Sequence, residues 1–208
     1  MPGYPIELDL RGRTVVVVGL GAVGRRKAAG LVESGARVIG VDPSGGVEMA
    51  GVEVLAEPYR PEHLGGASLA IAAAPAEVNR RVVLDARRLG VWVNSASDPA
   101  SGDFSVPATW RDGPLTLTVS TSGASPALAA ALRDRAASAL GPAAAGLVAL
   151  LAEIRPEVLA RIADPDARRR ALAEAADPRW LDLYEREGAG AARLALRQAL
   201  GLGGERPW

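Results

Sequence analysis

The chain contains no cysteine, and this absence removes several kinds of chemistry at once. Disulfide bonds, thiolate nucleophiles and cysteine-ligated metal sites are all excluded. Lysine and histidine each occur once, as Lys27 and His63. His63 lies in a polar connection between two apolar segments, where a lone histidine is expected to be an exposed polar residue rather than a catalytic group.

Charge of one sign is not in excess either, because 24 Lys and Arg balance 24 Asp and Glu in 208 residues. A neutral chain argues against a general nucleic-acid surface. The N-terminal segment lacks the basic and apolar regions of a signal peptide, and no window is expected to reach the length of a transmembrane helix. The 49% hydrophobic content predicts a folded protein with a sizeable core. We therefore expect a cytoplasmic enzyme or binding protein without a membrane partner.

A glycine-rich stretch follows the first run of valines. Gly19, Gly21 and Gly24 have the spacing G-x-G-x-x-G and lead into a helix-forming run. In a dinucleotide site the first glycine allows a tight turn, the second lets backbone approach a pyrophosphate, and the third lets helix and strand pack closely. The N–H groups at the start of that helix, where Ala22 and Val23 lie, are expected to face the phosphates.

An acidic residue ends the second apolar segment, residues 36–41. Asp42 lies about 20 residues after the glycines, the interval expected for a carboxylate that binds the adenosine ribose, with Pro43 beside it. A carboxylate there would repel a 2′-phosphate, which favours NAD over NADP. The alternative is that Asp42 only opens a turn with Pro43, Ser44 and Gly45. The order of strand, loop, helix, strand and acid favours nucleotide binding.

Strand and helix signals alternate through the first half of the chain. Strands are predicted at residues 52–56, 67–73 and 91–94, and a helix at 76–89. This alternation predicts an α/β fold, a Rossmann-like doubly wound parallel sheet. Ligands bind outside the carboxyl ends of such strands, so Ala73, Ala74 and Asn94 are expected to border the cofactor. Ordinary loop chemistry is the alternative for these positions.

The pattern changes after Pro107. Residues 115–121 alternate apolar and hydroxylated side chains, which predicts a strand with one buried face, paired either across a two-fold axis or within the chain. Ser125 is a natural N-cap, with Pro126 at the first helical position. Helices are expected to follow, with breaks at Gly141-Pro142, Asp164-Pro165, Asp177-Pro178 and residues 188–190.

Three separated motifs resemble those of the precorrin-2 dehydrogenases, including the bifunctional sirohaem synthases that also insert iron into sirohydrochlorin. The first is PIELDLRGRTVVVVGLGAVGRRKA, from Pro5 to Ala28. The second consists of Asn94, Phe104 and Pro107 at the family's intervals. The third is STSGASPALAAALR, residues 120–133.

The resemblance implies a homodimer that oxidises precorrin-2, an anionic tetrapyrrole, to sirohydrochlorin with NAD as cofactor. It implies a NAD-binding domain over residues 1–106, a small α+β dimerisation and substrate-loop segment over 107–142, and a helical domain over 143–208. Hydroxyl and N–H groups of the loop are expected to bind the substrate carboxylates. The residues concerned are Ser120, Thr121, Ser122, Gly123 and Ser125. The alternative is a strand-to-helix turn that needs serine only as a cap.

One departure from the family affects the catalytic prediction. Many members carry an aspartate three residues after the asparagine matched by Asn94, and here that position is Ser97, followed by Asp98. We expect Asp98 and Ser97 to be the catalytic candidates, although Asp103 is a further carboxylate nearby, or a solvated loop residue. Serine is a weak metal ligand, so no metal-binding residue is predicted and ferrochelatase activity is left open.

Two alternatives of other kinds remain. A non-enzymatic, dimeric NAD(H)-sensing domain would explain the first 95 residues or so, but it gives no reason for the loop at residues 120–125. A dehydrogenase for another small substrate lacks the support of a recognisable Lys, His or Tyr catalytic set.

Overall fold

The computed structural model describes residues 3–202, and these residues form two compact units. The first unit ends at Val106 and the second begins at Pro107. Each unit has a core of its own and is described separately.

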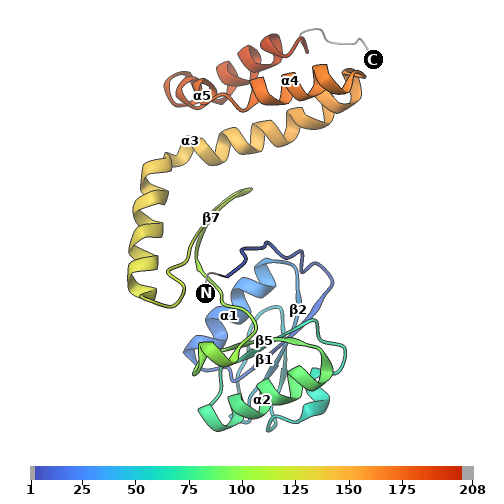
Figure 1. The fold of residues 1–208 in the computed structure, drawn as a ribbon, viewed down its shortest axis with the longest axis vertical. Coiled ribbons are helices and arrows are strands. Elements are labelled where there is room, and N and C mark those ends of the chain that lie inside the picture. Colours follow the sequence, from blue (N-terminus) through green and yellow to red (C-terminus); the bar gives the residue numbers. More distant parts are fainter. Residues whose placement is uncertain (1–2, 203–208) are drawn as a thin grey trace. The chain divides into compact units, whose positions relative to one another are not determined.

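The first unit is built on a parallel sheet of five strands in the order β3-β2-β1-β4-β5 (Figure 1). Every neighbouring pair of strands is parallel. The elements in chain order are β1 Thr14–Val18, α1 Ala22–Glu33, β2 Arg37–Val41, β3 Val52–Leu55, the 3-10 helix η1 Pro61–Leu64, β4 Leu69–Ala72, α2 Ala76–Leu89, β5 Trp92–Ser95 and the 3-10 helix η2 Pro99–Ser101.

Alternate valines of β1 point to opposite faces of the sheet and belong to two different cores. Val15 and Val17 pack in the core that contains Ala28 of α1, whereas Val16 and Val18 pack with the apolar face of α2. All four valines are at most 2% exposed. This is the burial expected of a central strand in a parallel sheet with helices on both faces.

The strand order reverses between β1 and β4. The chain runs from β1 outward to β2 and β3, then returns to β4 on the other side of β1 and continues to β5. The connections that leave the carboxyl ends of β1 and β4 therefore diverge, and ligands of doubly wound sheets bind at this point. The loops that start at Gly19 and Ala73 lie at this point.

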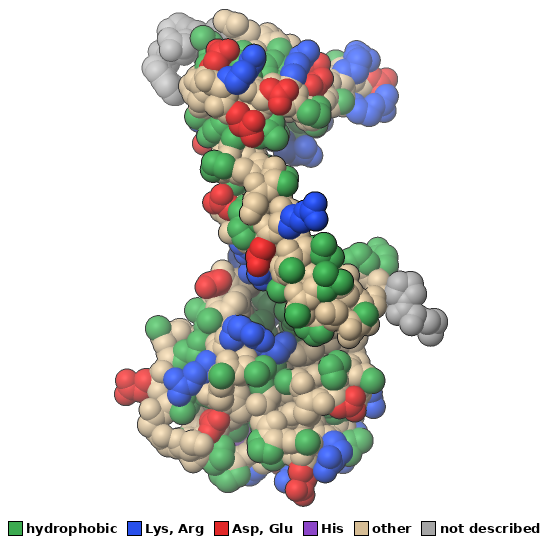
Figure 2. All heavy atoms as spheres, turned by 90° about the vertical axis from the view of Figure 1, so that its left-hand side faces the viewer, with side chains coloured by type: hydrophobic (Ala, Val, Ile, Leu, Met, Phe, Trp, Pro, Cys, Tyr) green, Lys and Arg blue, Asp and Glu red, His purple; other side chains and the backbone are tan. Residues whose placement is uncertain are grey.

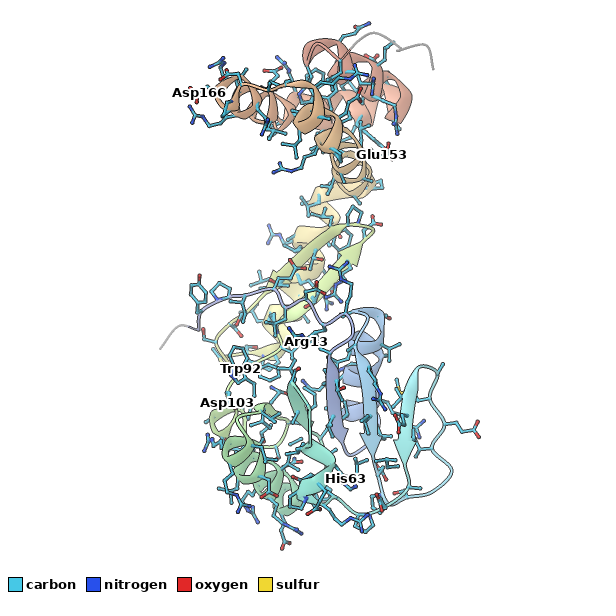
Figure 3. All side chains as sticks on the ribbon, turned by 90° about the vertical axis from the view of Figure 1, so that its right-hand side faces the viewer. Arg13, His63, Trp92, Asp103, Glu153 and Asp166 are labelled. Atoms are coloured by element: carbon cyan, nitrogen blue, oxygen red, sulfur yellow. The ribbon has the colours of Figure 1, made fainter. Side chains whose placement is uncertain are left out.

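Asp103 satisfies backbone hydrogen-bonding groups on the free edge of strand β5. Its N–H donates to the Val93 carbonyl over 2.7 Å, and its carboxylate accepts a hydrogen bond from the Val93 N–H over 2.9 Å. Figure 3 shows Asp103 beside this edge. Because an unpaired edge invites association with other chains, the carboxylate has a structural task here.

The second unit contains a hairpin followed by three helices. Strand β6, Ala108–Asp112, pairs antiparallel with β7, Leu115–Val119. The helices are α3 Pro126–Arg161, α4 Pro165–Ala175 and α5 Arg179–Ala199. Two glycines interrupt the long helices, Gly141 in α3 with φ 65° and Gly188 in α5 with φ 83°.

The helical part of this unit has its own core. Ile154 and Val158 of α3 pack with Trp180 and Leu196 of α5. Acidic and basic side chains are interspersed on the visible surface of these helices (Figure 2). Ion pairs such as that between Arg193 of α5 and Glu153 of α3 join neighbouring helices at the surface, where each contributes little to stability.

The predicted doubly wound parallel sheet is confirmed, and α2 has the predicted bounds. Ser125 caps α3 as predicted, because its Oγ accepts a hydrogen bond from the Leu128 N–H over 3.2 Å. Strand β6 was not predicted, since its sequence ATWRD ends in two charged residues and gives no clear alternation. Strand β7 pairs with it inside the chain.

Helix α3 contains an unexpected apolar window. Its mean hydropathy reaches 1.7 over 18 residues, which is long and apolar enough to cross a membrane by length and composition. The expectation that no window reaches this length was wrong, because alanine-rich sequence fills the stretch between Arg135 and Glu153. The break at Gly141 interrupts this stretch. One such helix is weak support for a membrane span, because core helices meet the same criteria.

The expectation that His63 is an exposed residue was also wrong. Its side chain is only 7% exposed. Nδ1 accepts a hydrogen bond from the Arg60 N–H over 3.0 Å, and Nε2 lies 2.9 Å from the Glu57 carboxylate. These contacts fix the start of η1, so the ring has a structural role.

Candidate functional site

The glycine loop, residues 19–24, brings backbone segments closer than side chains would allow. Gly19 has φ +90°, and a Cβ at this position would lie 2.6 Å from backbone atoms of Ala73 and Ala74. A Cβ on Gly24 would lie 1.8 Å from the Gly19 carbonyl oxygen. These two glycines therefore have a packing role, because they let α1 and the end of β4 approach the loop.

Gly21 differs from the other two glycines, because no protein atom lies within 4 Å of the position a Cβ would take. It precedes α1, which has neither a side-chain cap nor an acidic residue in its first turn. The first N–H groups of a helix lack intrahelical acceptors, and here they belong to Ala22, Val23 and Gly24. With the helix dipole, this open backbone fits the pyrophosphate of a dinucleotide.

Backbone N–H groups hold the Asp42 carboxylate from two sides. Oδ2 accepts a hydrogen bond from the Leu20 N–H over 2.6 Å, and Oδ1 accepts one from Ser44 over 2.9 Å, which closes a turn around Pro43. Burial acts to raise the pKa of Asp42, but these hydrogen bonds and the nearby Arg25 outweigh it, so the pKa is lowered. The ionised carboxylate is thus tied to the glycine loop and keeps lone pairs for ribose hydroxyls.

A buried asparagine that the sequence analysis missed fixes the end of β4. Asn79 of α2 is 1% exposed, accepts a hydrogen bond from the Ala74 N–H over 2.9 Å and donates to the Ala74 carbonyl over 2.8 Å. A signal for this role exists in the sequence. Asn79 occupies a core position of the helix, three and four residues before the buried Val82 and Val83.

Asn94, near the end of β5, is buried but only partly paired. Its Nδ2 donates to the Phe104 carbonyl over 2.8 Å, whereas its buried Oδ1 has no hydrogen-bond partner among residues 3–202. An unpaired buried acceptor costs about 1–3 kcal/mol. A donor from a ligand would remove this cost. Asn94 is in register with Ile71 of β4, one residue before the end of each strand.

The loop after β5 presents Ser97 and Asp98, which are both exposed. Ser97 Oγ accepts a hydrogen bond from Asn79 Nδ2 over 2.9 Å. The backbone of Asp98 is held by the buried Ser95 hydroxyl over 3.2 Å, while its carboxylate has no hydrogen bond to the described part of the chain. Asp98 therefore offers a free carboxylate, in contrast to Asp103, which is engaged with β5.

The serine loop, residues 120–125, lies in the second unit between β7 and α3. Ser122 has φ 51°, and no other non-glycine residue in the described ranges has a positive φ. The Ser125 N–H donates to Thr121 Oγ1 over 3.1 Å, and Ser120 Oγ accepts a hydrogen bond from the Ser122 N–H over 3.2 Å. Gly123 is also left-handed, with φ 85°. Glycine adopts this conformation without strain, whereas at Ser122 it costs about 1–3 kcal/mol, and strain of that kind is often found at ligand-binding loops.

The residues predicted from the sequence thus fall into two sets. The serine loop belongs to the second unit, and the others gather in the loops at the carboxyl ends of β1, β2, β4 and β5. Within residues 3–202 no group of three or more His, Asp and Glu side chains is arranged to hold a metal ion.

A doubly wound sheet with this glycine loop, and with an acid held against it at the end of β2, defines an NAD(P)-binding α/β protein. The family model NAD_binding_7, which describes an NAD(P)-binding domain, matches residues 6–108. The model described as sirohaem biosynthesis protein central matches residues 112–137, which include the serine loop. In both its NAD(P)-binding and its central segments the chain is thus similar to sirohaem synthases.

Siroheme synthases from two bacteria are similar in sequence to most of this chain. The siroheme synthase of Chromobacterium violaceum is 35% identical over 98% of this chain and 45% of that protein. Siroheme synthase 1 of Aeromonas salmonicida is 33% identical over 82% of this chain and 38% of that protein. The chain thus spans less than half the length of these relatives.

A solved structure described as SirC, precorrin-2 dehydrogenase, has the same fold. It matches 96% of this chain and 100% of its own with a TM-score of 0.73 at 24% identity. Because the match covers 96% of this chain, the similarity of fold to SirC extends over both units and includes the helices after the hairpin.

Proposed function

We propose that this chain is an NAD-dependent dehydrogenase that oxidises precorrin-2 to sirohydrochlorin, a step of sirohaem biosynthesis. The observation that carries the proposal is the presence in one chain of a dinucleotide-binding glycine loop and a sirohaem-type central segment with its serine loop. The names of the relatives and the fold of SirC support it. A domain that only senses NAD(H) would have no use for the serine loop.

Within this proposal the cofactor is NAD rather than NADP. The Asp42 carboxylate stays ionised and is tied by Leu20 to the glycine loop, where the adenosine ribose is expected. It would accept hydrogen bonds from ribose hydroxyls and repel a 2′-phosphate. When bound, NAD⁺ supplies the acceptor for the hydride.

The chain's own groups would bind the cofactor and remove one proton. The N–H groups at the start of α1 hold the pyrophosphate, with Pro43, Ala73 and Ala74 lining the site and Asn94 Oδ1 accepting a hydrogen bond from an amide donor. Precorrin-2 loses one hydride and one proton overall. The Asp98 carboxylate, exposed and without an internal partner, takes that proton and passes it to water.

The serine loop would bind the acetate and propionate groups of the tetrapyrrole. Its exposed hydroxyl and N–H groups are the donors that carboxylates require. We further propose that the protein is a cytoplasmic homodimer with the three-domain division expected from its family. Leu128 and Leu132 of α3, 51% and 42% exposed, support a dimer because they are apolar side chains without cover in a single chain.

Anaerobic turnover of precorrin-2 with NAD⁺ or NADP⁺, followed by the absorbance of NADH and sirohydrochlorin, tests this function. NADP⁺ should give at least tenfold lower kcat/KM. Subsequent addition of Fe²⁺ or Co²⁺ shows whether the product is metallated. NADH binding by a folded protein that produces no NADH would contradict the proposal and favour a sensor.

The role of Asp98 has its own test. Asp98→Ala should lower kcat by about 100-fold, the usual contribution of a general base, without changing the Kd of NADH. Asp166→Ala, which removes an exposed carboxylate on α4 (Figure 3), is the matched control and should retain full activity. Unchanged turnover in Asp98→Ala would remove Asp98 from the mechanism.

A further inference from the structure

Asn79 connects two loops of the candidate site. It is buried in the first turns of α2, yet its side chain reaches the backbone of Ala74, after β4, and the hydroxyl of Ser97, after β5. Ala74 in turn lies against Gly19 of the glycine loop. The buried Asn79 amide therefore holds both Ala74, the backbone that lies against the glycine loop, and Ser97, a candidate catalytic residue.

The orientation of the Asn79 amide is determined by its partners. The Ala74 N–H can only donate, so Oδ1 must face it at 2.9 Å, and the Ala74 carbonyl can only accept, so Nδ2 must face it at 2.8 Å. A flipped amide would lose both hydrogen bonds. The atom that lies 2.9 Å from Ser97 Oγ is consequently Nδ2, a donor.

The Ser97 hydroxyl must therefore accept from Asn79. A hydroxyl that accepts one hydrogen bond keeps its own proton for another partner, and Ser97 is exposed at the carboxyl end of the sheet. We infer that Asn79 is a positioning residue that presents Ser97 as a hydrogen-bond donor to an oxygen of the bound ligands. This inference rests on the proposed dehydrogenase function and assigns proton removal to Asp98 alone.

Two ligand oxygens have the required chemistry, a carboxylate of the tetrapyrrole and the carboxamide oxygen of the nicotinamide. Each of these oxygens can accept a hydrogen bond from a neutral hydroxyl, but neither can donate one. Either therefore requires that Ser97 acts as the donor. A hydrogen bond that involves a charged group is worth about 1.5–3 kcal/mol, which corresponds to about tenfold or more in affinity. A neutral carboxamide should show a smaller effect of about threefold to tenfold.

The test is a double-mutant cycle between the two side chains. Ser97→Ala removes the donor and leaves the contacts of Asn79 with Ala74 intact, and Ser97→Thr is the matched control that keeps a hydroxyl. Asn79→Asp keeps the acceptor for the Ala74 N–H and loses the donor both to Ser97 and to the Ala74 carbonyl. The effect through Ala74 is the same with and without the Ser97 hydroxyl, so the cycle isolates the part that acts through Ser97. The KM of precorrin-2, kcat and the Kd of NADH are measured for each, with melting temperature as a check on folding.

If Ser97 binds the substrate, Ser97→Ala should raise the KM of precorrin-2 by about tenfold at constant NADH affinity. If it binds the nicotinamide, the Kd of NADH should rise by about threefold or more at constant KM. Ser97→Thr, which keeps the donor, should retain more of the affinity than Ser97→Ala. Asn79→Asp should change the same constant as Ser97→Ala, and its effect on that constant should be smaller in the Ser97→Ala variant than in the parent protein.

Equal effects of Asn79→Asp in the parent protein and in the Ser97→Ala variant would overturn the inference, as would a Ser97→Ala variant with unchanged constants. Should Asn79→Asp fail to fold, Asn79→Ser, which is neutral but too short to reach Ser97, takes its place in the cycle. A parent protein that forms no NADH from precorrin-2 refutes the proposed function and the inference with it. An active parent with independent effects refutes only the inference.

Discussion

The three glycines of the loop have different physical tasks, and alanine substitutions should separate them. At Gly24 a Cβ would meet the Gly19 carbonyl oxygen at 1.8 Å. The position of the Cβ is fixed by the backbone of α1 and the oxygen is itself a backbone atom, so neither can rotate away. Overpacking of this kind costs about 1–3 kcal/mol, and so close a contact belongs at the upper end. Alanine returns about 1 kcal/mol through its better helix propensity. A net loss of about 2 kcal/mol remains for Gly24→Ala.

At Gly21 the same substitution meets no protein atom within 4 Å. The free protein should therefore lose only about 0.5 kcal/mol, the low end of the cost of alanine at a helix N-cap. The added methyl group instead occupies the space that the pyrophosphate needs. Loss of one charge-assisted hydrogen bond is worth about 1.5–3 kcal/mol, so the Kd of NADH should rise about 10- to 100-fold.

Calorimetry and fluorescence titration of NADH test both substitutions together. A unit of about 100 residues loses about 4 °C or more of Tm for each 1 kcal/mol. Gly24→Ala should therefore lower the Tm of the first unit by about 8 °C, and Gly21→Ala by about 2 °C. Gly21→Asp should abolish binding, because it adds a negative charge at the phosphate site. A Gly21→Ala variant that binds NADH like the parent would refute the assignment of the pyrophosphate to this backbone.

Three further predictions concern single side chains. Backbone hydrogen bonds outweigh burial and lower the pKa of Asp42 from 3.8, so the ionised carboxylate should stabilise the fold above pH 3.8 and lose this effect as the pH falls below it. Denaturation of the parent and of Asp42→Asn at a series of pH values should therefore show a stability difference that is constant above pH 3.8 and shrinks below it. Burial, and to a lesser extent the charge of Arg26, lowers the pKa of Lys27 from 10.5. NMR of the ¹³C-methylated Lys27 amine should therefore show titration below pH 10.5, and titration above pH 10.5 would contradict the partial burial of Lys27. Ser125→Ala removes the N-cap of α3 and should cost about 1 kcal/mol in urea denaturation, whereas Ser125→Asp should retain the stability.

Much of the first unit was predictable because its signals are local. The valines of β1, the spacing of the glycines and the acid after β2 lie within about 30 consecutive residues, and hydrophobic period and backbone requirements leave few alternatives for them. The capping of α3 by Ser125 is likewise a short-range property. These parts of the fold follow from residues that are neighbours in the sequence.

The features that were missed depend on contacts between distant segments or on context. Asn79 gains its role from Ser97, 18 residues further on, and only the packing of α2 against the sheet brings the two together. His63 is buried because Glu57 and the Arg60 backbone form its environment. Strand β6 forms because β7 supplies its partner, since its own sequence does not alternate. Composition and periodicity carry little information about such contacts.

The most direct test of the dehydrogenase function is the amount of NADH formed per precorrin-2 consumed, under strictly anaerobic conditions and with NAD⁺ as the only oxidant. An NAD-dependent precorrin-2 dehydrogenase should form one NADH for each sirohydrochlorin, with a rate that falls in Gly21→Ala in proportion to the loss of NADH affinity at low NAD⁺. Sirohydrochlorin without NADH, or no product from a folded protein that binds NADH, would contradict it.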